Sequence, residues 1–582
     1  MKTQRFANRF ARSACIVLAL LLILTTPALA AFNPSNGQAA KLVLGQPDFF
    51  SNTFHTTQTG MGNPSAVAVD PTTHKVFVAD CDNNRVLRFP SIYTLLNGAA
   101  AEAVLGQPNF TSSTTNTTQN GMICPEGVFV DAGGRLWVAD NWNNRVLRFD
   151  NAAGKANGAN ANGVLGQANF TSDTYATNQH SLSSPIGVFV DAGGRLWVAD
   201  STNNRVLRFD NAASKANGAN ADGVLGQLNF TSSGAATSQK GMNYPFNLAV
   251  DTGGRLWVAD ENNHRVLRFD NAASKANGAN ADGVLGQPNF TSANNLTDQS
   301  HMDSPQGVAV DNASARLFVV EYGNHRVLVF NAAAGLANGA NASYVLGQND
   351  FISSIAGATA TNLHGPEAVF FDPVSKVLLV ADSGNNRVLM YGNPFTPFSS
   401  TSTAAYDGFV LESAAASGKG GGLSATGTLR AGDDASNRRY RSILSFNTAG
   451  LPDNAVIHSV TLKIKKAGTA GTDPLTSHAL GSLLADIKKG SFGATTLELG
   501  DFQATSSANA VAHFSSIGAS WYQVTLPAAD FTYVNLSGVT QFRLRFSSTS
   551  NNNNIADYDS FYAGDVTTAA DRPVLTVQYY LP

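Results

Sequence analysis

Short apolar runs recur along the chain, and turn-forming residues separate them. Residues 127–131, 135–140, 145–149 and 163–167 are such runs, each rich in Val, Leu, Phe or Trp and flanked by Gly, Asn and Asp. Runs of this length and composition are typical of β-strands. The two glycines within residues 132–134 supply the positive φ that a tight hairpin connection requires. The pattern therefore predicts four consecutive antiparallel strands.

This four-stranded unit is repeated along most of the chain. The phrase Val-Leu-Gly-Gln recurs at intervals of 60 or 61 residues, and the phrase Arg-Val-Leu keeps the same spacing. The first phrase begins at Val43, Val104, Val164, Val224, Val284 and Val345, and the second at Arg85, Arg145, Arg205, Arg265, Arg326 and Arg387. Six copies of a four-stranded unit predict a six-bladed β-propeller, in which radial closure leaves few exposed edges.

The phase of the repeat predicts how the ring closes. Residues 42–46 carry the first Val-Leu-Gly-Gln strand and precede every other strand of their unit. The last unit ends after residues 387–391 without such a strand. We therefore expect strand 42–46 to become the outer strand of blade six, and the propeller to occupy residues 31–393.

A different pattern follows the repeat. Residues 394–403 are rich in Pro, Ser and Thr, which is typical of a linker. Residues 404–582 contain runs in which apolar and polar positions alternate, such as 442–446 and 541–546, with turn-rich flanks. Alternation of this kind is typical of half-buried strands. The expected fold class is all-β: a six-bladed β-propeller followed by a β-sandwich of the jelly-roll type.

Residues 1–30 have the composition of a secretory signal peptide. Four basic residues precede the apolar stretch 14–24, and Ala-Leu-Ala at residues 28–30 forms a cleavage motif. Eleven apolar residues are fewer than the ~20 that a membrane-spanning helix needs, although an uncleaved anchor is the alternative. We expect cleavage after Ala30, no membrane span in the mature chain, and a secreted, extracellular or cell-surface protein.

Composition excludes several classes of protein. Charged residues are 14% of the chain while apolar residues are 43%, a balance that argues against intrinsic disorder and against coiled coils. The net charge of -3 gives no electrostatic case for nucleic acid. Three cysteines in 582 residues exclude a disulfide-dense scaffold.

The repeated unit resembles a known family. It reads Pro-x-Gly-Val-x-Val-Asp, then Leu-x-Val-Ala-Asp, then Asn-Asn-Arg-Val-Leu-x-Phe, most plainly at residues 125–149, 185–209 and 245–269. This pattern resembles the NHL repeat, and the likeness extends over all six units. The resemblance implies a propeller that serves as a binding platform. Such propellers are also similar in fold to a minority of enzymes, the peptidyl-amidoglycolate lyases and virginiamycin-type lyases.

The C-terminal region resembles a second family. Tyr406-Asp407-Gly408, residues 441–446, Leu451-Pro452, 541–546 and 573–579 follow one another as in DNRLRE-type jelly-roll modules of secreted proteins. Those modules look like carbohydrate-binding modules, which implies attachment to polysaccharide or to a cell surface. Four aspartates of this region offer the oxygen ligands that Ca²⁺ takes. The predicted Ca²⁺ ligands are Asp433, Asp434, Asp557 and Asp559.

Positions that differ between blades are the candidates for function. A ligand site is needed once, so residues that recur in every blade are assigned to the scaffold. The variable positions lie after the proline of each inner strand and in the turn after Ala-Asp, on the same face as the long loops. We predict a ligand site at the channel mouth formed by Glu126, Trp142, Tyr244, Phe246, Glu261, Gln306, Tyr322 and Glu367. Aromatic and acidic side chains suit a sugar, a peptide or a cationic ligand, whereas capping of the blades is the alternative.

Two cysteines occupy the same face of adjacent blades. Cys81 follows the Ala-Asp of blade one, and Cys124 precedes the proline that enters blade two. In an oxidising compartment these positions predict a disulfide between the two blades. Two buried, unpaired thiols are the alternative.

These features lead to one functional hypothesis with two alternatives. We predict a secreted or cell-surface binding protein whose propeller takes a peptide, protein or glycan and whose jelly roll targets polysaccharide or a cell surface. No catalytic residue is assigned, and no cofactor other than the Ca²⁺ is expected. The alternatives are a propeller lyase or hydrolase acting on peptide or polysaccharide, and a structural component of the cell envelope.

Overall fold

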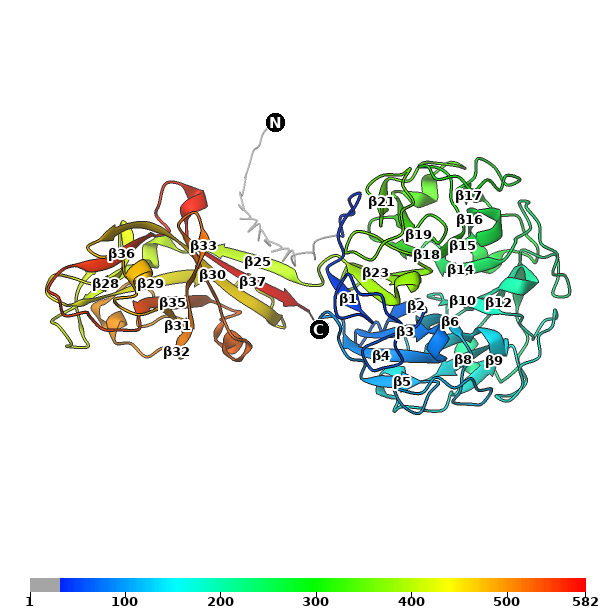
Figure 1. Ribbon diagram of the computed structural model, residues 1–582, viewed down its shortest axis with the longest axis horizontal. Helices are drawn as coiled ribbons and strands as arrows, with labels where there is room; N and C mark the ends of the chain where they lie inside the picture. Colours follow the sequence, from blue (N-terminus) through cyan, green and yellow to red (C-terminus); the bar gives the residue numbers. More distant parts are fainter. Residues whose placement is uncertain (1–31, 582) are drawn as a thin grey trace, which may run out of the picture.

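The computed structural model describes residues 32–581, so the expected signal peptide lies outside the described residues. The chain forms a ring of six four-stranded sheets followed by one curled sheet of 13 strands (Figure 1). No helix within residues 32–581 is long and apolar enough to cross a membrane. The all-β fold class expected from the sequence is confirmed, with a six-bladed propeller as its larger part.

Each blade consists of four strands in antiparallel order, and the first strand of each lies innermost. Blades one and two contain β2 (Pro64–Val69), β3 (Lys75–Asp80), β4 (Arg85–Ser91), β5 (Ala103–Leu105), β6 (Pro125–Val130), β7 (Leu136–Asp140), β8 (Arg145–Phe149) and β9 (Gly163–Leu165). Blades three and four contain β10 (Pro185–Val190), β11 (Leu196–Asp200), β12 (Arg205–Phe209), β13 (Gly223–Leu225), β14 (Pro245–Val250), β15 (Leu256–Asp260), β16 (Arg265–Phe269) and β17 (Gly283–Leu285). Blades five and six contain β18 (Pro305–Asp311), β19 (Arg316–Glu321), β20 (Arg326–Phe330), β21 (Tyr344–Leu346), β22 (Ala368–Asp372), β23 (Val377–Asp382), β24 (Arg387–Tyr391) and β1 (Leu42–Leu44).

The outer strand of blade six comes from the start of the described chain. β1 pairs antiparallel with β24, with Leu42 opposite Met390 and Leu44 opposite Val388. The same sheet continues to β23 and β22. Strands from both ends of the repeat therefore share one blade, which closes the ring through backbone hydrogen bonds.

A buried ion pair at the end of the second strand recurs in every blade. In five blades an arginine Nε lies 2.7 Å from an aspartate Oδ2, and in blade five Glu321 takes the place of the aspartate. Both side chains of each pair are fully buried. The remaining guanidinium donors of Arg145 bond the backbone carbonyls of Phe170, Thr118 and Gly121. Because these carbonyls belong to the long loops, the pair fixes those loops to the blade.

Neighbouring inner strands approach each other very closely at the third position of the strand. A Cβ on Gly127 would lie 2.0 Å from the carbonyl oxygen of Ile186, and one on Gly187 would lie 2.8 Å from that of Phe246. Glycine at this position in blades two, three and five therefore permits the close approach of the neighbouring inner strand. Apolar side chains from adjacent blades, such as Trp137 and Val198, fill the space between the blades further out.

The C-terminal sheet curls around its own hydrophobic core. Its strands are β25 (Thr396–Thr401), β26 (Gly408–Glu412), β27 (Gly420–Ser424), β28 (Thr428–Asp433), β29 (Arg439–Asn447), β30 (Val456–Ala470), β31 (Leu483–Lys489), β32 (Ala508–His513), β33 (Ser515–Gly518), β34 (Trp521–Thr525), β35 (Val539–Phe546), β36 (Asp557–Tyr562) and β37 (Val574–Tyr580). A single turn of helix, α1 (Pro474–Ser477), precedes β31. The core contains Leu462, Phe542 and Val577, all fully or almost fully buried.

Part of the expected linker belongs to this sheet. Thr396–Thr401 forms β25, which pairs antiparallel with β37 along its whole length. Pro397 is accommodated because β25 is an edge strand, where a missing N–H costs no ladder bond. The linker predicted for residues 394–403 is therefore mostly strand.

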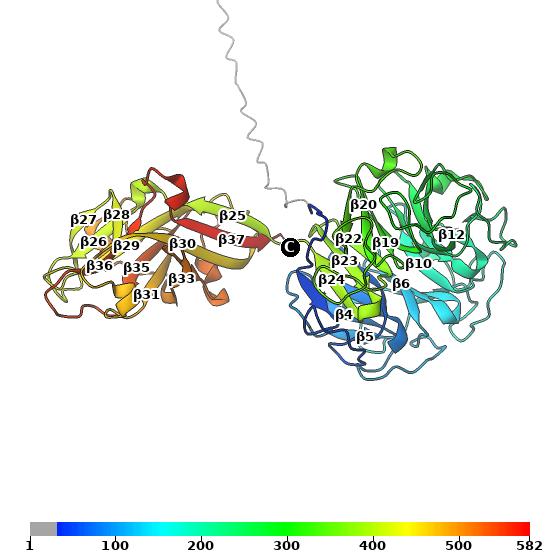
Figure 2. The same cartoon turned by 45° about the horizontal axis from the view of Figure 1, so that its top comes forward.

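Aromatic contacts join the two parts of the chain. Tyr93, which follows β4, stacks on Tyr580 with ring centroids 4.1 Å apart and an angle of 5° between the planes. Phe395 stacks on His458 with centroids 3.6 Å apart. Figure 2 shows the C-terminal sheet meeting the propeller beside blades one and six.

Candidate ligand site at the channel mouth

The mouth of the channel is built where each blade meets the next. The first residue of the turn after the second strand reaches the start of the following inner strand. The Ser201 hydroxyl donates to the carbonyl of Pro245 at 2.7 Å, and the Ser383 hydroxyl donates to that of Pro64 at 2.6 Å. The Gln306 side-chain amide donates to Glu261 at 2.9 Å in the equivalent place. The variable side chains predicted from the sequence therefore come from two positions that touch across each blade junction.

Three glutamates from alternate blades interact at this mouth. Burial raises the pKa of Glu126 to about 7, and repulsion from Asp82 and Glu261 adds to the shift. Burial raises the pKa of Glu367 well above its usual range, with further repulsion from Glu126, Glu261 and Asp82. Burial also raises the pKa of Glu261, while the hydrogen bond from Gln306 opposes that shift. Blades two, four and six thus bring their carboxyl groups within electrostatic reach of one another.

The carboxyl group of Glu126 lacks a hydrogen-bond donor. Its Oε2 atom is buried and has no partner among residues 32–581. Its Oε1 atom lies 3.3 Å from the sulfur of Cys124, which carries no hydrogen because it is disulfide-bonded. No lysine or arginine of the described chain is close enough to lower the pKa of Glu126 or Glu367. Glu126 and Glu367 are therefore acidic groups without a basic partner in residues 32–581, whereas His264 is close enough to lower the pKa of Glu261.

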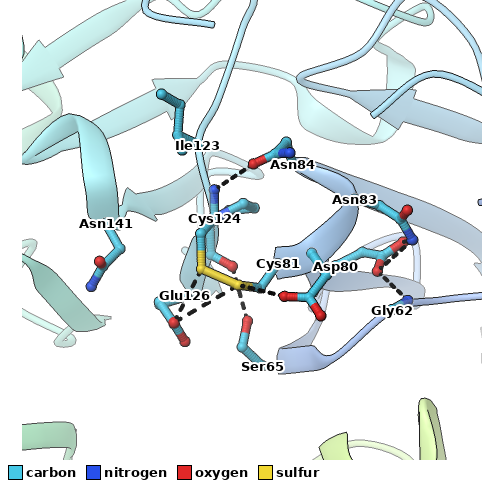
Figure 3. Close-up of a disulfide and its surroundings, with 12 residues drawn as sticks. Gly62, Ser65, Asp80, Cys81, Asn83, Asn84, Ile123, Cys124, Glu126 and Asn141 are labelled. Carbon is cyan, nitrogen blue, oxygen red and sulfur yellow. Dashed lines mark hydrogen bonds between the residues drawn. A yellow bond between two sulfur atoms is a disulfide. The ribbon is translucent and has the colours of Figure 1, made fainter. Parts of the chain in front are cut away.

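The expected disulfide between blades one and two is present. Cys81 and Cys124 are bonded, and both side chains are buried (Figure 3). The Cys124 backbone N–H donates to the Asn84 side chain at 2.9 Å, which fixes the loop of blade two to the turn of blade one. Figure 3 shows Glu126 pointing at the two sulfur atoms.

The aromatic residues predicted for the mouth occupy three different environments. Phe246 is only 7% exposed and therefore offers little surface to a ligand. Tyr244 is half-buried, and burial together with Glu261 and Glu126 raises the pKa of its hydroxyl. Trp142 and Tyr322 are 67% and 44% exposed, so they lie at the rim. The predicted residues therefore divide into an acidic centre and an aromatic edge.

Trp142 lies one residue beyond the turn position that the sequence predicted for it, which is the residue directly after Ala-Asp. The residue that follows the Ala-Asp of blade two is Asn141, which is buried and donates to the carbonyl of Pro185 at 3.3 Å. Trp142 is instead equivalent to Asp82 of blade one. Alignment of the Ala-Asp phrases, Ala139-Asp140 with Ala79-Asp80, gives this register directly. The same alignment would have identified Asp82 as a mouth residue.

An apolar cavity that the sequence did not predict lies within the channel. A cavity of about 290 Å³ is lined by the inner strands of all six blades, mainly by their later residues. Phe129 and Phe189 meet there with ring centroids 4.4 Å apart. A valine precedes the final aspartate of five inner strands, and these valines, at residues 69, 130, 190, 250 and 310, line the cavity.

Histidines do not form a metal site in the described chain. His301 pairs with Asp298 at 2.8 Å, and the ring of His364 packs against that of His325. Within residues 32–581, one group of three side chains has metal-ligand atoms within 4.8 Å of one another, and it consists of Cys81, Cys124 and Glu126.

The four aspartates proposed as Ca²⁺ ligands do not form one group. Asp433 and Asp557 lie opposite each other on β28 and β36. Asp434 instead binds Arg438 at 2.6 Å, and Asp559 binds Lys466 at 2.6 Å. Two of the four carboxylates are therefore already neutralised by basic side chains.

Comparison with known proteins identifies the repeat. The NHL repeat family matches residues 122–149, 182–209, 242–269 and 302–330, which lie in blades two to five. The chain therefore contains NHL repeats within a six-bladed propeller. The curated proteins include no match to this chain. No comparison identifies the C-terminal sheet as a DNRLRE-type module, so that resemblance stays a prediction.

Several solved structures are similar to the propeller part. A streptogramin B lyase structure is 11% identical, with a TM-score of 0.34, and the match covers 58% of this chain and 95% of that one. An auxiliary nutrient binding protein from Bacteroides thetaiotaomicron VPI-5482 is 13% identical, with a TM-score of 0.38, covering 60% and 76%. Hydrazine synthase from Kuenenia stuttgartiensis is 13% identical, with a TM-score of 0.34, covering 57% and 96%. At such low identity, none of these structures informs the ligand or the reaction of this chain.

Proposed function

We propose that the propeller is a ligand-binding domain whose mouth takes up the positively charged group of a peptide or protein. The observation that supports this proposal is the cluster of Glu126, Glu261 and Glu367. Burial raises the pKa of all three, and repulsion within the cluster adds to the shift for Glu126 and Glu367. Buried carboxylates without a counter-charge are unfavourable, so a cation that enters the mouth gains their full attraction.

The form of the site favours an organic cation. A bare metal ion needs ligand atoms gathered around one point, and the three glutamates do not form such a group among residues 32–581. An arginine guanidinium spreads five N–H donors over a plane and bonds several carboxylates at once. The exposed rings of Trp142 and Tyr322 add aromatic faces that can form cation–π interactions with the ligand.

The test compares two peptides that differ in charge alone. Acetyl-Ala-Arg-Ala-amide and its citrulline counterpart are titrated into the full chain by calorimetry at pH 8. We expect binding of the arginine peptide alone, weakening as the pH falls below about 7 because Glu126 then becomes protonated. Glu367→Gln should weaken binding at least about 10-fold, the cost of one charge-assisted hydrogen bond. Asp173→Asn, which changes an exposed carboxylate on a long loop, is the matched control.

The outcomes separate this proposal from simple capping of the blades. If the glutamates only cap the blades, neither peptide should bind, and the glutamine variants should behave like the wild type. Equal affinity for the arginine and citrulline peptides would also refute the proposal, because the charge would then contribute nothing.

Secretion and surface attachment remain part of the proposed function. The disulfide is compatible with an extracellular protein, and the signal peptide predicts that chains recovered from the medium begin at Ala31. N-terminal sequencing of the secreted protein tests this. Targeting by the C-terminal sheet would be supported if insoluble polysaccharide retains the full chain and Glu367→Gln does not change this retention. No specific observation in the described chain favours the alternative lyase or hydrolase.

A further inference from the structure

Four potential metal ligands meet around the disulfide at the mouth. The Glu126 Oε1 atom lies 3.3 Å from the Cys124 sulfur and 4.0 Å from the Cys81 sulfur. The Asp82 Oδ1 atom lies 3.7 Å from the Cys81 sulfur. In the oxidised protein the sulfur atoms offer these carboxylates neither a proton nor a positive charge (Figure 3).

We propose that reduction of the Cys81–Cys124 bond converts this corner of the mouth into a Zn²⁺ site. The ligands are the two thiolates and the Glu126 carboxylate, and Asp82 or a water molecule occupies the fourth position. The metal site shares Glu126 with the proposed peptide site, but it does not rest on that function, since it concerns a different redox state and a different ligand.

The distances match those between ligands of tetrahedral zinc. With Zn–S of about 2.3 Å and Zn–O of about 2.0–2.2 Å, sulfur and oxygen ligands lie about 3.5 Å apart and two sulfur ligands about 3.8 Å apart. The present sulfur–oxygen separations of 3.3, 3.7 and 4.0 Å lie within about 0.5 Å of that value. Once the sulfur–sulfur bond is broken, the two thiolates need only separate to about 3.8 Å.

The backbone that carries these ligands does not depend on the disulfide. The Cys124 N–H donates to Asn84, and the Cys81 N–H donates to the carbonyl of Asn63 at 3.3 Å. The equivalent junction of blades three and four has Ser201 and Tyr244 in place of the two cysteines and adopts the same turn, with the Tyr244 N–H donating to Asn204 at 2.8 Å. We therefore expect the ligands to stay in place when the bond is reduced.

A thiol or phosphine reductant supplies two electrons to the Cys81–Cys124 bond, and two protons from solvent complete the two thiols. The reductant becomes its own disulfide or phosphine oxide. Zn²⁺ then displaces both thiol protons, which return to solvent, and binds the thiolates together with Glu126.

The experiment uses the full chain carrying Cys15→Ala, so that two thiols remain. The protein is reduced with a phosphine in urea, refolded without oxygen and titrated with Co²⁺ as a spectroscopic substitute for Zn²⁺. We expect one equivalent of Co²⁺ with thiolate charge-transfer absorption and tetrahedral visible bands, and displacement of Co²⁺ by Zn²⁺. The oxidised protein should give neither signal.

Variants identify the ligands. Cys81→Ser should weaken Zn²⁺ binding more than about 100-fold, because even changes in the residues behind metal ligands cost 10–100-fold. Glu126→Gln should weaken binding while leaving both thiols titratable, whereas Asp173→Asn should change nothing. If reduction lowers the melting temperature, Zn²⁺ should restore it. The proposal is overturned if the reduced protein has two titratable thiols but neither Co²⁺ nor Zn²⁺ changes its absorption or its melting temperature.

Discussion

Arg205 holds two of the long loops that form the mouth face, and its replacement tests how firmly they are held. Its Nε atom lies 2.7 Å from Asp200, and both side chains are fully buried. Its other donors bond the carbonyls of Asn178 and Ser181, in the loop before blade three, and that of Phe230, in the loop before blade four. Arg205→Met keeps most of the side-chain volume and removes every one of these bonds.

The expected loss of stability is large for a single residue. Removal of one partner from a buried, hydrogen-bonded ion pair costs about 3–5 kcal/mol, because the remaining charge stays buried. Three backbone carbonyls lose their donor as well, although water that enters the vacated space replaces part of those bonds. We therefore expect the free energy of unfolding of the propeller to fall by about 4 kcal/mol, out of the roughly 5–15 kcal/mol typical of a domain.

Urea denaturation followed by tryptophan fluorescence measures this loss. Trp137, Trp197 and Trp257 are almost fully buried between blades and report on the propeller. Arg195→Met is the matched control, because the Arg195 side chain is 37% exposed and its pairs with Asp191 and Asp210 span 3.4 and 3.7 Å. An exposed pair of this kind is worth less than about 1 kcal/mol. The reasoning is refuted if the two variants lose equal stability.

Three further predictions concern closure and pH. Deletion of residues 31–46 should unfold the propeller, because β1 is the outer strand of blade six; an unchanged melting temperature would exclude this closure. The free energy of unfolding of the wild type should fall as the pH rises above about 4.5, and Glu367→Gln should reduce that fall. The reason is that the raised pKa of Glu367 makes the folded state bind this proton more tightly than the unfolded state does. Denaturation of both proteins at pH 5 and at pH 8 measures the difference. Burial and the neighbouring His364 lower the pKa of His325, whose Nδ1 atom accepts a hydrogen bond from the Gly365 N–H at 2.9 Å. Protonation of His325 below pH 6.5 should therefore destabilise the folded state, and His325→Asn should remove this loss. Circular-dichroism melting at pH 5 tests this, and a variant that melts with the wild type contradicts it.

Much of the propeller was predictable because its determinants are local. The strand pattern, the repeat period and the glycines of the hairpins lie within each 60-residue unit, so six copies specify six blades. The disulfide was predictable because Cys81 and Cys124 occupy equivalent faces of adjacent units, and the structure confirms it. In contrast, β25 is a strand because it pairs with β37, nearly 180 residues away, and not because of its own composition.

The chain pattern by itself determined the number of blades, their order and the face on which the variable residues gather. Tertiary structure alone decided which of those residues interact. Glu126, Glu261 and Glu367 come from three alternate blades, and their raised pKa values result from burial and from repulsion across the channel axis. Electrostatic energy depends on separation in space and on local exposure to water, and neither quantity is encoded in the spacing of residues along a repeat.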